Sequence, residues 1–430
     1  MKKIFILAFA SLTGYAQNPA PAKPQAKPIA LMNGTIHVGN GQVIPNGVII
    51  FDKGVITTVA DATTARLNMD GMEVISVAGK HVYPGLISPA STVGLEEIGA
   101  VRATVDKQEV GVLNPNVRAL VAYNTDSEII PTIRNNGVLL TQAMPEGGTV
   151  SGSSSIMQAD GWNWEDAVLK ADDGLWLTWP GYFATVFDFT DFSRVIKKNE
   201  KREEAIAALR ATFADAKAYA SQTEQSPKNL KLEAMRGLFS GQQNLYVRAD
   251  YAKDILEAAQ FARAMGVQKV VIVGAEEADR VAGFLAEQKV PVILGALHRL
   301  PNRPDEAVDL PYRMPGILQK AGVLVSLSYA GEWWRTRNLP FQAGTAVGFG
   351  VPDKEEALKM ITSNTAQILG IADKVGTLEP GKHATLFVSM GDALDMRTNV
   401  VERVFIQGRA TNLDDRHKRL YKQYQDKYGK

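Results

Sequence analysis

The sequence of 430 residues contains no cysteine and only five histidines. The lack of cysteine excludes disulfides, thiolate nucleophiles, sulfur ligands for a metal and a lipid-modified cysteine. The scarcity of histidine limits any site that needs several imidazoles, because His37, His81, His383 and His417 lie towards the two chain ends. Only His298 falls in the long central part of the chain.

An excess of charge of one sign is also missing. The formal net charge is +1, and 45% of the residues are hydrophobic and 22% charged, as in ordinary globular proteins. Nucleic-acid binding depends on clustered Lys and Arg, so this balance gives no reason to expect it. No stretch beyond the N-terminus approaches about twenty uninterrupted apolar residues, so we expect no membrane span.

The first sixteen residues are typical of a secretory signal peptide. Lys2 and Lys3 precede an apolar run over residues 4–12, and the small residues Gly14 and Ala16 favour cleavage before Gln17. The alternative is a buried N-terminal helix or strand. We expect export across the inner membrane to a periplasm, with residues 17–28, rich in Pro, Ala and Lys, as a linker.

The pattern of residues along the chain changes twice. Residues 29–82 and 373–412 consist of short β-type runs broken by turn residues, and we expect them to form one composite β-domain from both chain ends. Between them, apolar strand-length runs alternate with helical patterns over residues 83–372. Residues 413–430 read as a charged terminal helix whose tyrosines dock on the body, or less readily as a basic docking surface.

This alternation of strands and helices predicts a parallel sheet closed into an eight-fold α/β barrel. The strand candidates are residues 85–88, 137–143, 245–249, 270–274, 290–295 and 323–328, and the helix candidates are residues 202–222, 252–266, 276–288 and 354–370. Residues 150–190 show no clear period, so we expect a long insertion over one barrel end. The Ser/Gly run at 151–155 is interpreted as a turn, since no base is at hand for a serine nucleophile.

Four motifs in order resemble the amidohydrolase superfamily, in its imidazolonepropionase-like branch. They lie at residues 31–36, 82–87, 362–370 and 376–384 and span nearly the whole mature chain. The resemblance implies a (β/α)8 TIM barrel with a composite β-sandwich. It also implies one or two divalent metals at the barrel mouth that activate water for hydrolysis of C–N bonds.

The residues that should hold those metals are replaced in this chain. After the Pro-Gly-Leu-Ile motif, the resemblance implies an aspartate and two histidines on the first strand, and two later histidines at the ends of the next strands in the barrel. These positions hold other residues here, namely Ser88, Ala90, Thr92, Arg248 and Val273. The late-barrel aspartate is also missing, and the nearest carboxylate is Glu332. We therefore predict no metal cofactor; the alternative is zinc or manganese in an atypical site.

Several residues remain as candidates for such an atypical site. The carboxylates that could lie near the mouth and bind a divalent ion weakly are Glu96, Glu97, Asp250, Glu276 and Glu332. Arg248 could replace the metal's charge or grip a carboxylate, but a salt bridge across the mouth is favoured. We interpret His298 as a hydrogen-bonded structural residue in preference to a general base.

Two functions follow from these patterns. The favoured one is a catalytically silent amidohydrolase-like protein that binds a ligand or a partner, either an active paralogue or a second copy of itself. The alternative is an active hydrolase of non-peptide C–N bonds, such as cyclic amides, with an unusual site built from carboxylates, His298 or Arg248.

Overall fold

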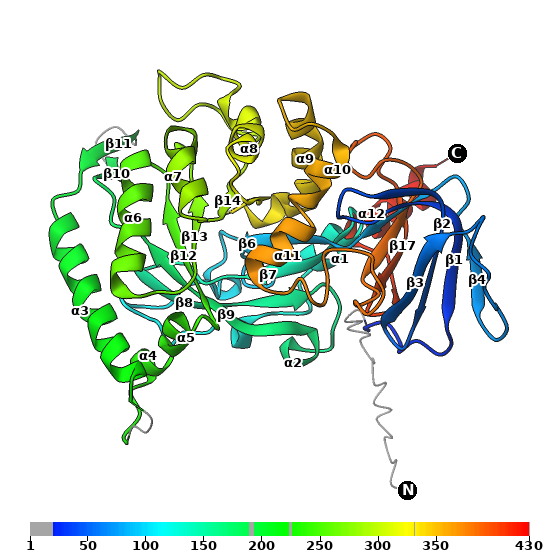
Figure 1. The fold of residues 1–430 in the computed structure, drawn as a ribbon, viewed down its shortest axis with the longest axis horizontal. Coiled ribbons are helices and arrows are strands. Elements are labelled where there is room, and N and C mark those ends of the chain that lie inside the picture. The colour runs from blue at the N-terminus through cyan, green and yellow to red at the C-terminus, as the bar shows by residue number, and fades with distance from the viewer. Residues whose placement is uncertain (1–19, 189–192, 223–225, 331, 430) are drawn as a thin grey trace, which may run out of the picture.

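The computed structural model describes residues 20–188, 193–222, 226–330 and 332–429 and contains two large β-sheets (Figure 1). The predicted signal peptide lies outside the described residues. Residues 20–28 have no helix or strand, and Gln25 fixes them to the β-domain through bonds to Phe51 O and Gly54 N. Among the described residues, no helix combines the length and apolarity needed to cross a membrane.

Both chain ends build one eight-stranded β-domain, seen at the right of Figure 1. Its strands are β1 (Ile29–His37), β2 (Val43–Asp52), β3 (Val55–Asp61), β4 (Glu73–Ser76), β5 (His81–Pro84), β16 (Leu386–Ser389), β17 (Val401–Ile406) and β18 (Arg409–Thr411). The order is β18-β17-β16-β5-β1-β2-β3, with β4 paired to β1. Since β5 pairs with both β1 and β16, the two chain ends meet at this strand.

Tight turns and apolar packing explain why this sheet folds over on itself. Lys53 and Gly54 both have positive φ, as do Gln407 and Gly408, which is the backbone of a two-residue hairpin turn. The rings of Phe51 on β2 and Phe405 on β17 meet edge to face with centroids 5.0 Å apart, although these strands are not neighbours. This contact closes the predicted sandwich around a buried apolar centre.

The second sheet is the predicted barrel. Its strands, in spatial order, are β6 (Leu86–Ser91), β7 (Val138–Ala143), β8 (Val150–Gln158), β9 (Val168–Thr178), β12 (Asn244–Ala249), β13 (Val270–Gly274), β14 (Val292–Leu294) and β15 (Val325–Leu327). The fold class expected from the sequence, a TIM barrel beside a composite sandwich, is therefore confirmed.

One part of the predicted barrel was wrong. Residues 150–178 are not an insertion over a barrel end but the barrel strands β8 and β9, and β8 runs antiparallel to both of its neighbours. The Ser/Gly run at 151–155 is accordingly a strand and not a turn. The strands β10 (Phe183–Asp188) and β11 (Ser193–Lys198) pair with each other in a separate sheet.

Small residues in β8 are required by close contacts. A Cβ on Gly152 would lie 2.4 Å from the carbonyl oxygen of Val117, and the φ of Gly152 is +130°. The hydroxyl of Ser154 donates to Asp173 at 2.7 Å. The Ser/Gly run at 151–155 thus has few apolar residues because Gly152 packs closely against Val117 and Ser154 bonds to Asp173.

The helix predicted over residues 354–370 is interrupted, and the interrupting segment closes the barrel. The segment forms two helices, α10 (Lys354–Lys359) and α11 (Ser363–Leu369), separated by residues 360–362. In this break, Met360 O accepts from Leu327 N at 3.1 Å and Ile361 O accepts from Ile87 N at 2.9 Å. The short segment therefore bridges β15 and β6, which do not pair directly.

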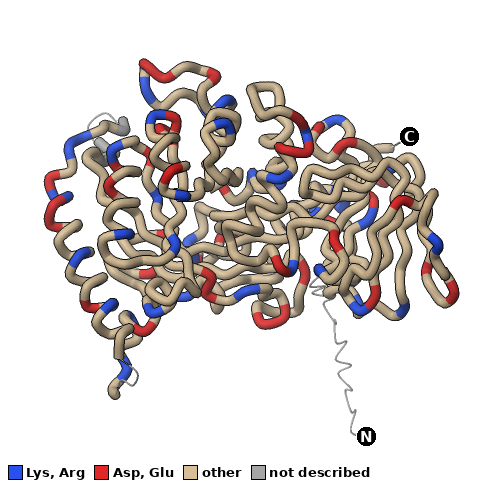
Figure 2. Tube along the Cα trace, in the orientation of Figure 1, with Lys and Arg blue, Asp and Glu red and all other residues tan. Residues whose placement is uncertain are grey.

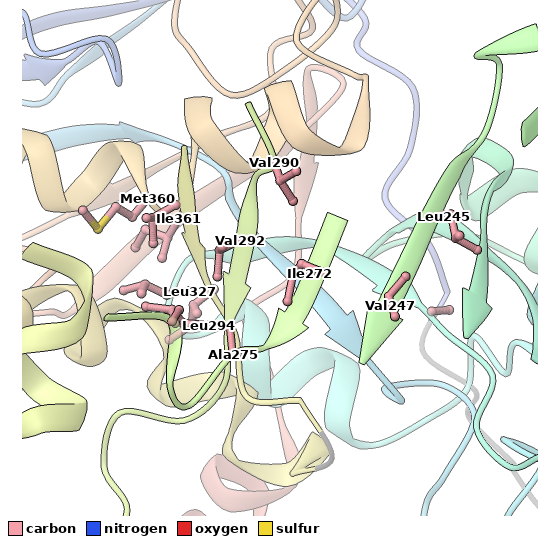
Figure 3. Close-up of a cluster of buried hydrophobic side chains, with 14 of the residues drawn as sticks. Leu245, Val247, Ile272, Ala275, Val290, Val292, Leu294, Leu327, Met360 and Ile361 are labelled. Carbon is pink, nitrogen blue, oxygen red and sulfur yellow. The ribbon is translucent and has the colours of Figure 1, made fainter. Parts of the chain in front are cut away.

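Helices cover the outside of the barrel. The longer ones are α3 (Arg202–Ala220), α6 (Ala252–Met265), α8 (Leu310–Lys320) and α9 (Leu339–Gly348), and the shorter ones are α1 (Ile129–Arg134), α2 (Trp164–Ala167), α4 (Leu230–Glu233), α5 (Arg236–Ser240) and α7 (Ala282–Glu287). Outward side chains of the strands, such as Val247, Ile272 and Leu294, pack beneath them (Figure 3). The last helix, α12 (Arg416–Tyr428), has no buried residue.

The barrel interior combines an aromatic stack with a buried polar network. Trp176 and Tyr246 stack with centroids 4.9 Å apart. The hydroxyl of Tyr246 donates to Asp173 at 2.6 Å, and Gln142 and Ser154 donate to the same carboxylate at 2.9 and 2.7 Å. Burial raises the pKa of Asp173, while these donors act to lower it. A carboxylate inside the barrel persists only with such donors.

Replacement Tyr246→Phe should lower the free energy of unfolding by about 1–3 kcal/mol, because it removes one donor from a buried carboxylate and keeps the ring. The measurement is urea unfolding followed by tryptophan fluorescence. Tyr421→Phe, which removes a hydroxyl from a ring that is 70% exposed, is the matched control and should leave the stability unchanged. Equal stability of the two variants would show that the Asp173 network contributes nothing.

Candidate functional site

A long connection covers one half of the barrel mouth. Residues 96–118, which we name the strap, follow β6 and run past the end of β7 and along the first residues of β8. Backbone bonds fix it, among them Glu146 N to Lys107 O at 2.6 Å, Asn114 N to Val150 O at 2.8 Å and Ser153 N to Val117 O at 2.8 Å. The strap therefore lies over the side of the mouth that contains the first strands of the barrel.

The other half of the mouth is open as a cavity of about 650 Å³. Its walls come from the segments that follow β12, β13, β14 and β15, where loops of a TIM barrel usually carry chemistry. Charged lining residues of both signs are present, namely Arg248, Arg299, Arg335, Asp250, Glu276 and Glu332. Figure 2 shows Lys and Arg interspersed with Asp and Glu along the described chain.

The positions expected to hold metal ligands have no such chemistry. Ala90 and Val273 are fully buried among apolar side chains of the barrel interior. Ser88 and Thr92 are also buried, and their hydroxyl oxygens have no hydrogen-bond partner among the described residues. Ala90 has φ of +52°, and its N–H donates to Gln142 Oε1 at 3.0 Å. The ligand positions have become part of a packed barrel interior.

Arg248 reaches the mouth from the end of β12. Its Nη2 donates to Glu146 Oε1 at 3.1 Å, and the guanidinium carbon lies 5.4 Å from the centre of the Trp176 ring. Its Nε and Nη1 groups have no hydrogen-bond partner among the described residues, and the side chain lines the cavity. Arg248 thus makes a salt bridge across the mouth and still presents unpaired donors to the cavity.

Glu146 links Arg248 to the strap. Lys107 on the strap lies 3.0 Å from Glu146 and 2.7 Å from Glu96. Burial acts to raise the pKa of Glu146, but the charges of Arg248 and Lys107 outweigh it and hold this pKa below its ordinary value of 4.5. The four side chains form an alternating chain of charges across the half of the mouth that the strap covers.

Asp250 lies two residues beyond Arg248 and is exposed to the cavity. The surrounding walls and the charge of Glu276 raise its pKa to about 7, against the effect of Arg248 and Arg299. Glu276 Oε1 itself accepts a hydrogen bond from Asn302 Nδ2 at 2.6 Å. Asp250 is therefore a carboxyl that can hold or release a proton near neutral pH in the cavity.

His298 lies in the same cavity, on the loop after β14. Its Nε2 bonds to Thr345 Oγ1 at 2.8 Å and its Nδ1 lies 3.4 Å from the Tyr329 hydroxyl. Burial and Arg335 lower the pKa of His298. Since both ring nitrogens contact hydroxyls, the ring is held in place by the cavity wall.

The sequence candidates divide between these two halves of the mouth. Asp250, Glu276 and Glu332 line the cavity, whereas Glu96 pairs with Lys107, and Glu97 accepts from Ser127 at 2.5 Å. Within the described ranges, no group of three or more His, Asp or Glu side chains is placed to hold a metal ion. The residues present do not fit the divalent metal that the resemblance implies, because a guanidinium and two alkyl groups occupy its ligand positions.

Known proteins of the same architecture are similar to the chain over nearly its full length. A family model described as the amidohydrolase family matches residues 315–411. A solved amidohydrolase from Thermotoga maritima is 26% identical, with 89% of this chain and 99% of that chain covered and a TM-score of 0.77. The chain thus has the fold of the amidohydrolase superfamily, and residues 315–411 match its family model.

More distant members of the superfamily share only the fold with this chain. A putative prolidase from Bifidobacterium longum is 16% identical, with 90% of this chain and 95% of that chain covered and a TM-score of 0.54. An adenosine deaminase from Xanthomonas campestris, solved with bound zinc, is 14% identical, with 94% and 99% covered and a TM-score of 0.55. A search of curated proteins found no match.

Two charged residues of the barrel mouth were not predicted from the sequence. Glu146 follows β7 and Lys107 lies on the strap, and neither belongs to a motif. The signal that could have found Glu146 is its position directly after a predicted barrel strand, since strand ends meet at the mouth. Lys107 had no such signal, because the course of the strap is not periodic.

Replacement Arg248→Met should lower the free energy of unfolding by about 1–3 kcal/mol, because Glu146 loses a charged donor in a mostly buried position. The measurement is chemical unfolding at several pH values. The pKa of Glu146 is depressed in the folded state. The loss of unfolding free energy should therefore have its full size above about pH 4.5 and become smaller as acid protonates Glu146.

Arg397→Met is the matched control for this change. The Arg397 side chain is 85% exposed and pairs with Asp395, so its removal should not change the stability. An Arg248→Met protein as stable as the wild type at neutral pH would contradict the role given to the mouth ion pair.

Proposed function

We propose that this protein is an exported amidohydrolase-like barrel that is silent as a metal hydrolase and binds a small ligand bearing a carboxylate. Arg248 carries this proposal, because a fixed cation stands where the superfamily places a metal ligand. The imidazolonepropionase-like branch remains the part of the superfamily that the four sequence motifs favour.

Catalytic silence as a metal hydrolase is supported by the chemistry of the mouth. A guanidinium repels a divalent ion, and Ala90 and Val273 offer no donor atoms. The strap also runs past the end of β7 and along the first residues of β8, and β7 is the neighbour of the strand on which the first ligands would stand. Recovering a metal site would require several substitutions together with movement of the strap.

Binding of a carboxylate is supported by the shape and charge of the cavity. Its volume of about 650 Å³ falls within the range of small-molecule sites. Arg248 points donor groups into it that have no partner among the described residues, and guanidinium groups bind carboxylates through paired hydrogen bonds. Asp250 near the same wall can accept a hydrogen bond from an amine or hydroxyl of the ligand.

Succinate is a suitable probe for this site. Isothermal titration of the metal-free mature protein should show saturable binding that is weakened at least about tenfold by Arg248→Met, since a charged hydrogen bond is lost. Arg397→Met should bind as the wild type does. Binding that survives unchanged in Arg248→Met would place the ligand elsewhere.

An active hydrolase remains a second candidate, because Asp250 has a pKa of about 7 and lies in the cavity with His298. General acid–base catalysis needs such a group. Hydrolysis of a cyclic amide by metal-free protein, abolished by Asp250→Asn, would support this candidate against silence. Stoichiometric zinc or manganese in protein purified without chelator would contradict the silent site.

Export is proposed from the first sixteen residues alone. The protein expressed in a Gram-negative host should appear in the periplasmic fraction with Gln17 as its first residue, as N-terminal sequencing can determine. A cytoplasmic protein beginning at Met1 would contradict this proposal.

A partner protein is the other form that a silent barrel could take. An active paralogue or a second copy of the chain remains proposed from the sequence pattern. Co-elution with either at micromolar concentration, together with no response to succinate, would favour the partner over the ligand.

A further inference from the structure

A second cavity lies at the junction of the β-domain and the barrel, remote in sequence from the mouth residues. Its volume is about 240 Å³. Strands β1 and β5 contribute one wall, α10 the next, and the loop after β16 the third. The lining residues are His37, His81, Tyr83, Lys354, Glu355, Leu358, Asp392 and Leu394.

Two histidines and a carboxylate form a continuous hydrogen-bonded row beside this cavity. His37 Nδ1 lies 2.6 Å from Glu355 Oε1, and His37 Nε2 lies 2.9 Å from His81 Nδ1. The His37 ring stacks on Tyr83 with centroids 4.2 Å apart, which fixes its plane. His81 Nε2 has no hydrogen-bond partner among the described residues.

The carboxylate sets the direction of every hydrogen bond in the row. Glu355 can only accept, so His37 Nδ1 must carry a hydrogen. With both rings neutral, His37 Nε2 then accepts and His81 Nδ1 donates. The remaining nitrogen, Nε2 of His81, is left with a lone pair as an acceptor at the cavity.

The charge of the cavity lining complements that acceptor. Lys354 contributes one positive charge, and Glu355 and Asp392 contribute two negative charges, which leaves a net charge of −1 when the histidines and Tyr83 are neutral. Lys354 is turned to Asp392 by an ion pair at the exposed rim. Leu358 and Leu394 supply apolar wall for a short hydrocarbon group.

We propose that this cavity is a binding site for a small organic amine, whose ammonium group donates a hydrogen bond to Nε2 of His81. The volume limits the ligand to a small amine, since a cavity of about 150 Å³ accommodates benzene. This site is independent of the function proposed for the barrel mouth.

Protonation should abolish this acceptor by a definite route. If the histidine pair takes up one proton while the two bonds of the row persist, a hydrogen must stand on His81 Nε2, whichever ring holds the charge. Burial and His37 lower the pKa of His81, against Asp392 and Glu355. Amine binding should therefore persist at neutral pH and fail on acidification.

The test uses propylammonium as the probe and the five histidines as reporters. In the intact protein labelled with ¹⁵N-histidine, long-range NMR correlations at about pH 8 should show His81 with a hydrogen on Nδ1 and none on Nε2. Propylammonium should shift the His81 signals saturably, propionate should not, and the affinity should fall at least about tenfold by about pH 5. A hydrogen on Nε2 at the higher pH, or equal shifts with propionate, would overturn the proposal.

Glu355→Gln and its neighbour Glu356→Gln form a matched pair of variants. A glutamine side chain in place of Glu355 can donate as well as accept, so the fixed direction of the row is lost and propylammonium should bind at least about tenfold more weakly. Glu356 bonds to Gln319 and Lys359, away from the cavity, so its variant should bind as the wild type does. Equal binding by both variants would contradict the role of the row.

Discussion

The ion pair between Arg248 and Glu146 is the interaction on which the barrel mouth depends. A guanidinium at a strand end inside the rim requires a counter-charge, and Glu146 provides it at 3.1 Å. Glu146 in turn holds Lys107, and Lys107 holds Glu96 at the base of the strap. Together with the backbone bonds of the strap, this chain of charges holds the strap over one half of the mouth.

The packing beneath the mouth follows from the apolar residues at positions 90 and 273. In the absence of polar ligands at Ala90 and Val273, apolar side chains extend up to the level of Arg248, whose guanidinium lies over Trp176. The buried polar groups of the barrel interior include Asp173 and its donors. Because these donors come from three different strands, the network also ties β7, β8 and β12 together.

The architecture could be predicted from the sequence because it depends on local periodicity. The helix at 252–266 and the strand at 270–274 follow from apolar spacing, and the structure has them at nearly the same residues. The short β-type runs over residues 29–82 and 373–412 placed the two halves of the β-domain. These features depend on neighbours in the chain, which a single sequence displays.

The parts that could not be predicted depend on contacts between distant residues. Strand β8 contains Gly152 and serines because Val117 and Asp173 lie against it, and such a strand lacks the apolar pattern by which strands are found. The expectation that the metal ligands are replaced rests on the positions after the Pro-Gly-Leu-Ile motif and at two later strand ends, namely Ser88, Ala90, Thr92, Arg248 and Val273. A salt bridge of Arg248 across the mouth was expected, but its partner could not be named, because Glu146 lies 102 residues from Arg248 in the chain.

The two cavities differ in the polarity of the groups that line them. At the mouth, Arg248 keeps donors that no described residue uses, so a ligand must supply acceptors. Between the domains, Glu355 orients both histidines so that the cavity receives an acceptor, and a ligand must supply donors. In each case a buried or half-buried ion fixes the polarity of a neighbouring group. That polarity, and not the shared barrel fold, decides what each cavity can bind.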